Sequence, residues 1–203
     1  MDTQAVTSFG DRPAIAMTDE QLMIAFAEGK TDAFSELFTR YKQPLFGFFR
    51  RRVVELAQAE ELTQETFLAV LRASSRYESS ALFRTYLYSI AFRILQAHRR
   101  KTAFRATFLG ATHGDREPAM QSSVLAGVVV REAVGKLSLW DREVLMLREF
   151  EELSYAEIAE LLKLPVNTVR SRLFRARLAL HGILAAPAPS SSTTGLTEFE
   201  EGI

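Results

Sequence analysis

The segment from Leu153 to Leu180 restricts the possible folds more than any other part of the chain. Ser154 and Glu157 stand at capping-box spacing, which predicts that a helix begins there. Pro165 cannot continue that helix, but the first turn of a second helix accepts it. The apolar residues that fall on one side of each helix are Ile158, Ala159 and Leu162, then Val169, Leu173 and Ala176. The pattern predicts two short helices joined by a tight turn, a helix-turn-helix.

The outer side of the second helix is basic. Between Leu161 and His181 there are five lysine or arginine residues and no acid. A basic helix that faces away from its core suits the DNA major groove, where arginine hydrogen-bonds to guanine edges and phosphates. The predicted DNA-reading residues, called the recognition set below, are Asn167, Thr168, Arg170, Ser171, Arg172, Phe174, Arg175 and Arg177. A solvated basic surface on a purely structural hairpin is the alternative.

The remaining sequence also carries helical patterns, and strand patterns are almost absent. Apolar stripes of helical period predict four helices between Thr18 and Lys101, enough for one bundle. Gly110, Gly114 and Pro118 then indicate a linker. We expect an all-α protein with two small helical domains joined by a flexible linker, the C-terminal one containing the helix-turn-helix. The expected parts are a flexible N-terminus (1–17), a first domain (18–101), a linker (102–125), a second domain (126–186) and a disordered tail (187–203) rich in Pro, Ser and Thr.

Local signals refine the first domain. Thr18 and Gln21 stand at capping-box spacing, and Gly29 is placed to end the helix that they open. Pro44 lies inside the next helical stripe and predicts a bend or a restart there. We therefore expect one helix between Thr18 and Gly29, and a second helix that bends or restarts at Pro44.

The segment Leu82–Lys101 has more aromatic residues than a single buried stripe needs. Phe83, Tyr86, Tyr88 and Phe92 are interleaved with arginines. Unstacked bases of a single-stranded nucleic acid stack on aromatic rings while arginines neutralise the phosphates. The competing interpretation is that each ring belongs to the core of the helical domain.

Composition excludes several classes of function. The 203-residue chain has no cysteine and only three scattered histidines, so we expect no metal site. No Gly-rich phosphate loop or nucleophile elbow appears, so we expect no catalytic residue and no cofactor. No apolar run approaches the roughly 20 residues that span a bilayer, and no signal peptide is recognisable. We therefore expect a cytoplasmic protein without a membrane span.

The net charge of zero conceals a segregated pattern. The chain has 25 basic and 25 acidic residues, and only five of the basic ones are lysine. The stretch from Arg93 to Arg105 contains no acid, whereas Asp141 to Glu160 contains seven. Arginine has a planar fork that matches phosphate and guanine. The composition therefore favours a nucleic-acid partner over a generic polyanion.

Three motifs occur in a diagnostic order: Glu60–Leu68, then Phe83–Ala91, then Leu153–Ala159 with Pro165–Leu173. Together they resemble the extracytoplasmic-function sigma factors of bacterial RNA polymerase, within the sigma-70 family. The resemblance covers about residues 18–186. It implies a first domain that binds core RNA polymerase and the melted −10 strand of a promoter. It also implies a second domain that reads the −35 element as duplex, and no enzymatic activity.

The resemblance also assigns residues to partners. It implies that core polymerase is bound by Glu61, Leu62, Gln64, Glu65 and Phe67. The residues that it assigns to the −10 strand, called the −10 set below, are Arg76, Tyr77, Ser79, Ser80, Phe83, Tyr86, Arg93, Arg99 and Arg100. The recognition set would read promoter DNA at −35. Tyr86 stands where the family usually has tryptophan, and Arg93 stands where many members have asparagine.

Two further expectations concern partners and rival functions. Family members are commonly held inactive by an anti-sigma factor, so the resemblance implies such a partner. A ligand-responsive helix-turn-helix repressor would also combine a helical domain with a DNA-reading helix. That alternative gives no reason for the acidic motif Glu60–Glu65.

Overall fold

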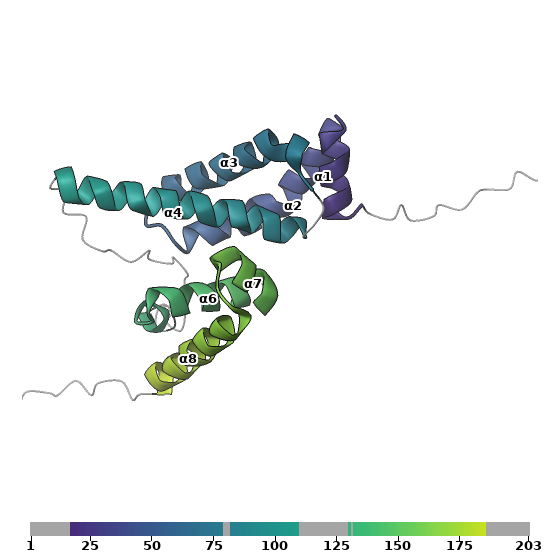
Figure 1. The fold of residues 1–203 in the computed structure, drawn as a ribbon. Helices are drawn as coiled ribbons and strands as arrows, with labels where there is room; N and C mark the ends of the chain where they lie inside the picture. The colour runs from purple at the N-terminus through teal and green to yellow at the C-terminus, as the bar shows by residue number, and fades with distance from the viewer. Residues whose placement is uncertain (1–16, 79–81, 110–129, 131, 186–203) are drawn as a thin grey trace, which may run out of the picture. The chain divides into compact units, whose positions relative to one another are not determined.

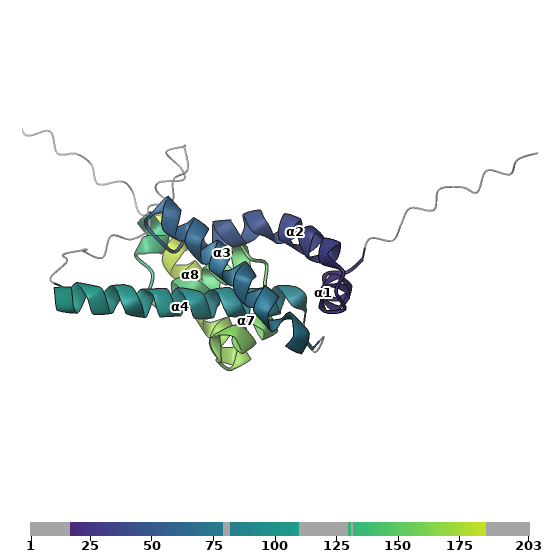
Figure 2. The same cartoon turned by 90° about the horizontal axis from the view of Figure 1, so that it is seen from above.

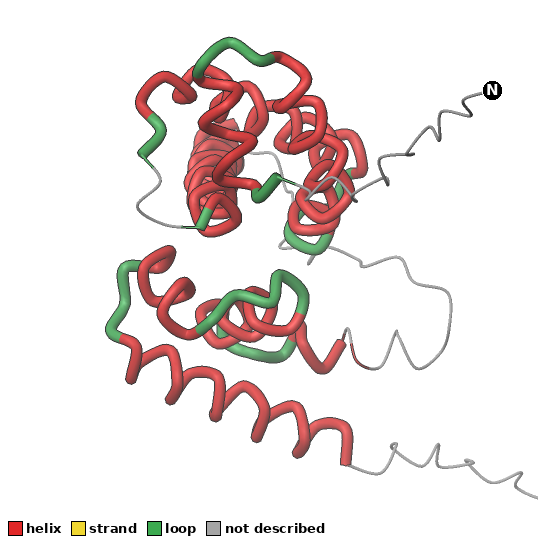
Figure 3. Tube along the Cα trace, turned by 90° about the vertical axis from the view of Figure 1, so that its right-hand side faces the viewer, coloured by secondary structure: helices red, strands yellow, loops and turns green. Residues whose placement is uncertain are grey.

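The computed structural model describes residues 17–78, 82–109, 130 and 132–185, and every element in these ranges is helical (Figures 1 and 3). The chain divides into two compact units. The first unit comprises Met1–Phe49 and Glu55–Thr112, and the second comprises Arg50–Val54 and His113–Ile203. The all-α expectation is confirmed. Among the described helices, none has both the length and the apolar character needed to cross a membrane.

The first unit contains four α-helices and one 3-10 turn. They are α1 (Asp19–Ala27), α2 (Thr31–Arg50), α3 (Leu56–Ala73), η1 (Ser74–Arg76) and α4 (Phe83–Leu109). The predicted capping box forms, because Thr18 accepts from the Gln21 amide and Gln21 accepts from the Thr18 amide. Gly29 follows α1 at a φ of +100°, a backbone conformation that favours glycine. Helices α3 and α4 lie side by side in both ribbon views (Figures 1 and 2).

Helix α2 runs through Pro44 as one element, where the sequence predicted a bend or a restart. A proline inside a helix costs about 3 kcal/mol through a lost hydrogen bond and ring crowding. Leu45, Phe48 and Phe49 follow it directly and are completely buried. Burial of three large apolar side chains, each contributing roughly 1.5–3 kcal/mol, offsets that cost.

Aromatic rings join α2 to its neighbours. Phe67 of α3 contacts Phe38 of α2 with ring centroids 4.8 Å apart. Tyr88 of α4 contacts Phe48 of α2 at 5.5 Å. These tilted ring pairs contribute beyond the area that they bury, because ring edges and faces carry opposite partial charges. The core of the first unit is thus partly aromatic, which accounts for several aromatic residues in this half of the chain.

Helix α4 is longer than the sequence predicted. It extends to Leu109, so residues 102–109 are helical where we expected the linker to begin. The reason is local: Thr102–Leu109 contains neither glycine nor proline, and Gly110 is the first residue that favours a helix end. The rest of the expected linker, residues 110–125, falls outside the described residues. In the expected second domain, residues 132–135 are helical.

The second unit is built from α6 (Leu139–Glu149), α7 (Tyr155–Leu162) and α8 (Val166–Ala185), which pack against one another. The capping box of Ser154 and Glu157 opens α7 as predicted. Both predicted apolar sides are buried, with Ile158 and Val169 completely inaccessible to solvent. Lys163 makes the turn at a φ of 56°, so a lysine occupies the left-handed position that glycine would occupy without steric cost.

Phe150 is the C-cap residue of α6 and is about half exposed, because the helix ends before it. The predicted N-terminal segment lies outside the described residues apart from Met17, and the whole predicted tail lies outside them.

Candidate nucleic-acid interface

The outer face of α8 carries the recognition set. Val169, Leu173 and Ala176 face the core of the second unit and fix the rotation of the helix. The opposite face is therefore exposed to solvent. The exposed members of the recognition set are Asn167, Arg170, Ser171, Phe174, Arg175 and Arg177, while Thr168 and Arg172 are half-buried. Phe174 is 68% exposed, which is unusual for an apolar side chain and places a ring among the arginines.

Acidic residues of α6 hold three of the recognition-set arginines. The Arg172 Nη1 atom donates to the Asp141 Oδ1 atom at 3.1 Å, and the Arg175 Nη2 atom donates to the same oxygen at 3.4 Å. Arg177 donates to Glu149 at 2.7 Å. The residues of the two Asp141 contacts are 31 and 34 positions apart, and no sequence pattern predicted that they would meet. Asp141 is thus a candidate site residue that the sequence patterns did not identify.

The pKa of Asp141 reflects these contacts. Burial alone would raise the pKa of this carboxyl group, but hydrogen bonds from Ser138, Arg175 and Arg172 together bring it below its ordinary value of 3.8. The carboxylate therefore stays charged throughout the physiological range. It restricts the Arg172 and Arg175 side chains through hydrogen bonds to one oxygen.

The aromatic residues at the start of α4 divide between core and surface. Phe83 is only 1% exposed, so it cannot stack on a base as the −10 set required. Its ring instead contacts Tyr41, with centroids 5.4 Å apart, and supports Tyr77 and Tyr86. Tyr77 and Tyr86 are half-buried and meet edge to face at 5.2 Å. Burial and the nearby Glu20 raise the pKa of Tyr77 to about 12, so its hydroxyl stays neutral and can donate.

Three members of the −10 set lie on one face of α4, together with two aromatic residues outside the set. Tyr86, Arg93, Arg100, Phe104 and Phe108 are spaced by seven or four residues, so they follow one side of the helix. Arg93 and Arg100 are exposed, whereas Arg99 is half-buried. The exposed Phe104 and Phe108 rings contact each other at 4.3 Å and were not predicted as site residues. Of the remaining members, Arg76 is exposed, while Ser79 and Ser80 fall outside the described ranges.

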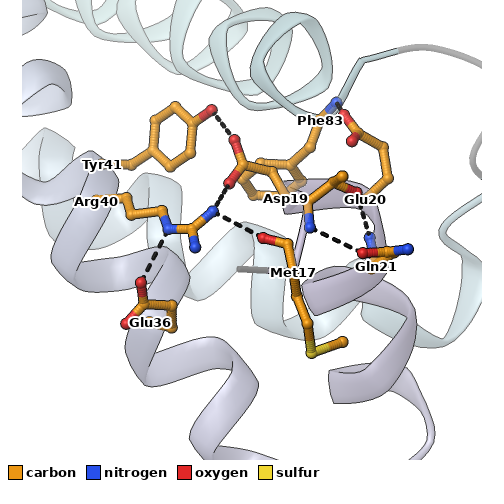
Figure 4. Close-up of polar contacts among 9 residues, drawn as sticks. Met17, Asp19, Glu20, Gln21, Glu36, Arg40, Tyr41 and Phe83 are labelled. Carbon is orange, nitrogen blue, oxygen red and sulfur yellow. Dashed lines mark hydrogen bonds and ion pairs between the residues drawn. The ribbon is translucent and has the colours of Figure 1, made fainter. Parts of the chain in front are cut away.

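A polar network fixes the N-terminal end of α4 (Figure 4). Glu20 of α1 accepts a 2.8 Å hydrogen bond from the Phe83 amide, one of the helix donors without an intrahelical partner. Asp19 accepts from Arg40 at 2.6 Å and from the Tyr41 hydroxyl, whose pKa is raised by burial and by that carboxylate. The network thereby joins α1 to α2 and to α4.

Comparison with known proteins places both units in one family. Residues 37–105 match the family model "Sigma-70 region 2", and residues 128–180 match "Sigma-70, region 4". The chain is 34% identical over 177 residues to the RNA polymerase sigma-H factor of Pseudomonas aeruginosa, which covers 80% of this chain and 91% of the relative. The chain is an extracytoplasmic-function sigma factor.

Other relatives agree with this assignment. The sigma factor is 30% identical to the ECF RNA polymerase sigma-E factor of Haemophilus influenzae, over 79% of this chain and 92% of the relative. Among solved structures, it matches CnrH in complex with the cytosolic domain of CnrY at 27% identity and a TM-score of 0.63, over 82% of this chain and 96% of that one. It therefore directs RNA polymerase to promoters and binds DNA, and the ligand-responsive repressor alternative is disfavoured.

The α3 helix of the sigma factor presents part of the predicted polymerase-binding residues. Glu61, Gln64 and Glu65 are exposed, whereas Leu62 and Phe67 are buried in the core of the first unit. Leu62 and Phe67 therefore help to hold the helix in place, and Phe67 also lines the groove between α2 and α3. The exposed face borders a groove between α2 and α3, whose lining includes Phe38, Lys42, Glu60 and Gln64. No three potential metal-binding side chains come together in the described ranges of the sigma factor.

Proposed function

We propose that this sigma factor divides promoter recognition between its units, with α8 reading −35 as duplex and the α4 face reading −10 as a melted strand. The observation that carries the proposal is the outer face of α8. It presents Arg170, Phe174 and Arg175 to solvent on a helix whose opposite side is completely buried. A helix held this rigidly can enter a major groove in one orientation.

At −35, three side chains share the reading. Arg170 and Arg175 are placed to donate to guanine edges, and Phe174 is placed to contact a thymine methyl group. Arg172 and Thr168 lie closer to the core, which suits contacts with phosphate. Asp141 restricts the Arg172 and Arg175 side chains before DNA arrives. Less side-chain entropy is then lost on binding than for two unrestrained arginines.

At −10, the buried Phe83 ring packs beneath the half-buried Tyr77 and Tyr86 rings and supports them. Those two rings offer stacking surface to unstacked bases, each stack contributing about 1–3 kcal/mol. Arg93 and Arg100, on the same face of α4, are placed to meet phosphates. Arg93 donates to the Ser89 carbonyl at 3.2 Å, which aligns it along the helix and leaves further donors available.

Core polymerase would dock on the exposed acidic residues of α3. Glu61, Gln64 and Glu65 present acceptors to a basic partner, and Leu62 and Phe67 support them from inside. The proposal assigns the chemistry of transcription to the polymerase and no catalytic step to this chain. It also places the protein in the cytoplasm, where the promoters and the polymerase are.

An anti-sigma factor would hold the chain inactive by covering its polymerase-binding or DNA-binding faces. The solved relative CnrH, which is 27% identical, is bound to the cytosolic domain of CnrY. That complex supports a protein partner for this chain as well. Expressing the sigma factor alone should then raise target transcription, and co-expressing its inhibitor should reverse the rise.

Reconstituted transcription tests the proposal. The purified chain, added to core RNA polymerase, is expected to direct initiation from promoters that core polymerase alone ignores. Footprints should cover duplex at −35 and unpaired bases at −10. A chain that binds core polymerase but protects neither element would contradict the division of promoter recognition between α8 and α4.

A further inference from the structure

The outer face of α8 carries an exposed apolar pair among its arginines. Phe174 is 68% exposed, and Leu178, one turn further along, is 60% exposed. Residues four apart lie on the same side of a helix, so the two form one apolar strip. Leu178 lies outside the recognition set, so base reading gives it no role. An apolar strip on a helix that also binds DNA favours a partner other than DNA for part of the time.

The sequence directly after α8 has the complementary character. Residues 186–203 lie outside the described structure and contain no lysine, arginine or histidine. Leu196, Phe199 and Ile203 supply three large apolar side chains, and the three acids Glu198, Glu200 and Glu201 lie between them. This segment therefore combines apolar anchors with negative charge, which is the inverse of the basic, partly apolar face of α8.

Chain length permits the two to meet. Leu196 lies eleven positions after Ala185, where α8 ends, and an extended chain of eleven steps spans at most about 36–40 Å. Phe174 lies eleven residues before Ala185 in the helix, which is about 16 Å. The segment can thus turn back and reach the apolar strip without being fully extended.

We propose that residues 196–203 dock on the outer face of α8. Phe199 and its apolar neighbours would cover Phe174 and Leu178, and the glutamates would lie near Arg170 and Arg175. The docked segment would occupy the surface that duplex DNA needs, so it would compete with DNA in the free protein. This inference rests on the proposed role of α8 in reading duplex DNA and adds a regulation of that same face.

The expected size of the effect is moderate. A tethered segment acts at a local concentration in the millimolar range, so weak intrinsic affinity suffices for substantial occupancy. If the face is covered for about 80–90% of the time, the apparent affinity for DNA falls about five- to tenfold. The glutamates contribute through exposed charges, so the effect should weaken as salt rises.

The test uses full-length variants and a fluorescent duplex of arbitrary sequence. Phe199→Ser should tighten duplex binding about fivefold at low salt. The triple variant Glu198→Gln, Glu200→Gln and Glu201→Gln should also tighten duplex binding, and its affinity should depend less on salt. Leu178→Ala, on the docking face, should tighten binding to a similar extent. Combining Leu178→Ala with Phe199→Ser should add nothing further, because both remove one contact.

A matched control uses a second exposed ring. Phe108 of α4 is 70% exposed, and Phe108→Ala removes it without touching α8. Its effect should simply add to that of Phe199→Ser. Non-additivity with Phe108→Ala in place of Leu178→Ala would mean that the segment docks on α4, and it would overturn the proposal. If Leu178→Ala and Phe199→Ser are non-additive only at protein concentrations where dimers form, the segment docks on a second copy of the chain. That result would also overturn the proposal.

A readout without DNA separates this inference from the proposed function. Backbone amide NMR shifts of the full chain and of Phe199→Ser should differ around residues 170–178. Identical spectra there, or identical duplex affinities of all variants at every salt concentration, would overturn the docking. Neither result would affect −35 reading by α8, which transcription assays on Arg170→Ala decide.

Discussion

Helices α4 and α8 are both basic, but they hold their cations in different ways. Helix α4 contains no acid, and among the described residues Arg100, Lys101 and Arg105 have no ion-pair partner. On α8, by contrast, Arg172 and Arg175 pair with Asp141 of the neighbouring α6. The difference matches the two forms of DNA that the proposal assigns to them. A melted strand is flexible and tolerates mobile cations beside aromatic rings, whereas duplex bases must be met by side chains in fixed positions.

The two helices also differ in what lies beneath their binding faces. Under the α4 face there is an aromatic cluster centred on Phe83, and its N-terminal amide is held by Glu20. Under the α8 face there are small and aliphatic side chains such as Val169 and Ala176. The two faces therefore rest on different packing, which is aromatic beneath α4 and small or aliphatic beneath α8.

The largest expected effect tests the aromatic support of α4. Phe83→Ala should destabilise the protein by about 3–5 kcal/mol, because it removes a buried ring and leaves a cavity beneath Tyr77 and Tyr86. Urea denaturation followed by circular dichroism measures it. Phe108→Ala, on the same helix but 70% exposed, is the matched control and should change stability by less than about 0.5 kcal/mol. Equal effects of the two substitutions would show that Phe83 is not part of the core.

The next effect tests the reading face of α8. Arg170→Ala should lower discrimination for the −35 element by about 1–3 kcal/mol, because one arginine–base contact is lost. Transcription from a −35-dependent promoter would fall, while binding to core polymerase and thermal stability would not change. Arg170 has no ion pair among the described residues, so its loss leaves no acid without a partner. If −35-dependent transcription is unchanged, Arg170 does not contact bases.

A smaller effect concerns the turn that sets the angle of α8. Lys163 adopts a left-handed conformation, which costs a non-glycine residue roughly 1 kcal/mol. Lys163→Gly should therefore stabilise the second unit by up to about that amount, less the entropy that glycine adds to the unfolded chain. The thermal midpoint measures the change. Lys163→Ala is the control, since alanine keeps the steric cost, and it should not stabilise.

Much of this fold could be predicted from sequence because its determinants are local. Capping boxes, the proline after α7 and the apolar stripes of α7 and α8 act within one or two helical turns, and the buried residues Ile158 and Val169 were correctly placed. The burial of individual aromatic rings was harder to predict. Tyr86 and Phe83 lie three residues apart, and only packing against α2 decides which of them is buried.

The contacts that could not be predicted join residues far apart in the chain. Asp141 meets Arg172 and Arg175, and Glu20 caps α4 from 63 residues away. A charge pattern shows that acids and arginines are segregated, but it does not show which pairs meet. The predicted start of the linker failed for a different reason: alanine and threonine after Lys101 are compatible with helix and with loop, and the helix continues until Gly110.

The smallest effect tests the ion pairs that distinguish α8 from α4. Asp141→Asn keeps the shape of the side chain but removes its charge, so Arg172 and Arg175 lose their restraint. Nonspecific duplex binding should tighten slightly, because one acid near the basic face is gone, while the ratio of specific to nonspecific affinity should fall. Exposed and half-buried pairs contribute little, so a loss of stability of about 0.5–1 kcal/mol is expected.

The pH dependence gives this last prediction its sign. The pKa of Asp141 lies below its ordinary value of 3.8 in the folded protein, so the ionised carboxylate stabilises the fold above that value. That contribution is lost as the pH falls through the lowered pKa. The stability difference between wild type and Asp141→Asn should therefore be constant from pH 5 to 8 and shrink below about pH 4. A difference that instead changes near neutral pH would mean that another group, and not this carboxylate, restrains the two arginines.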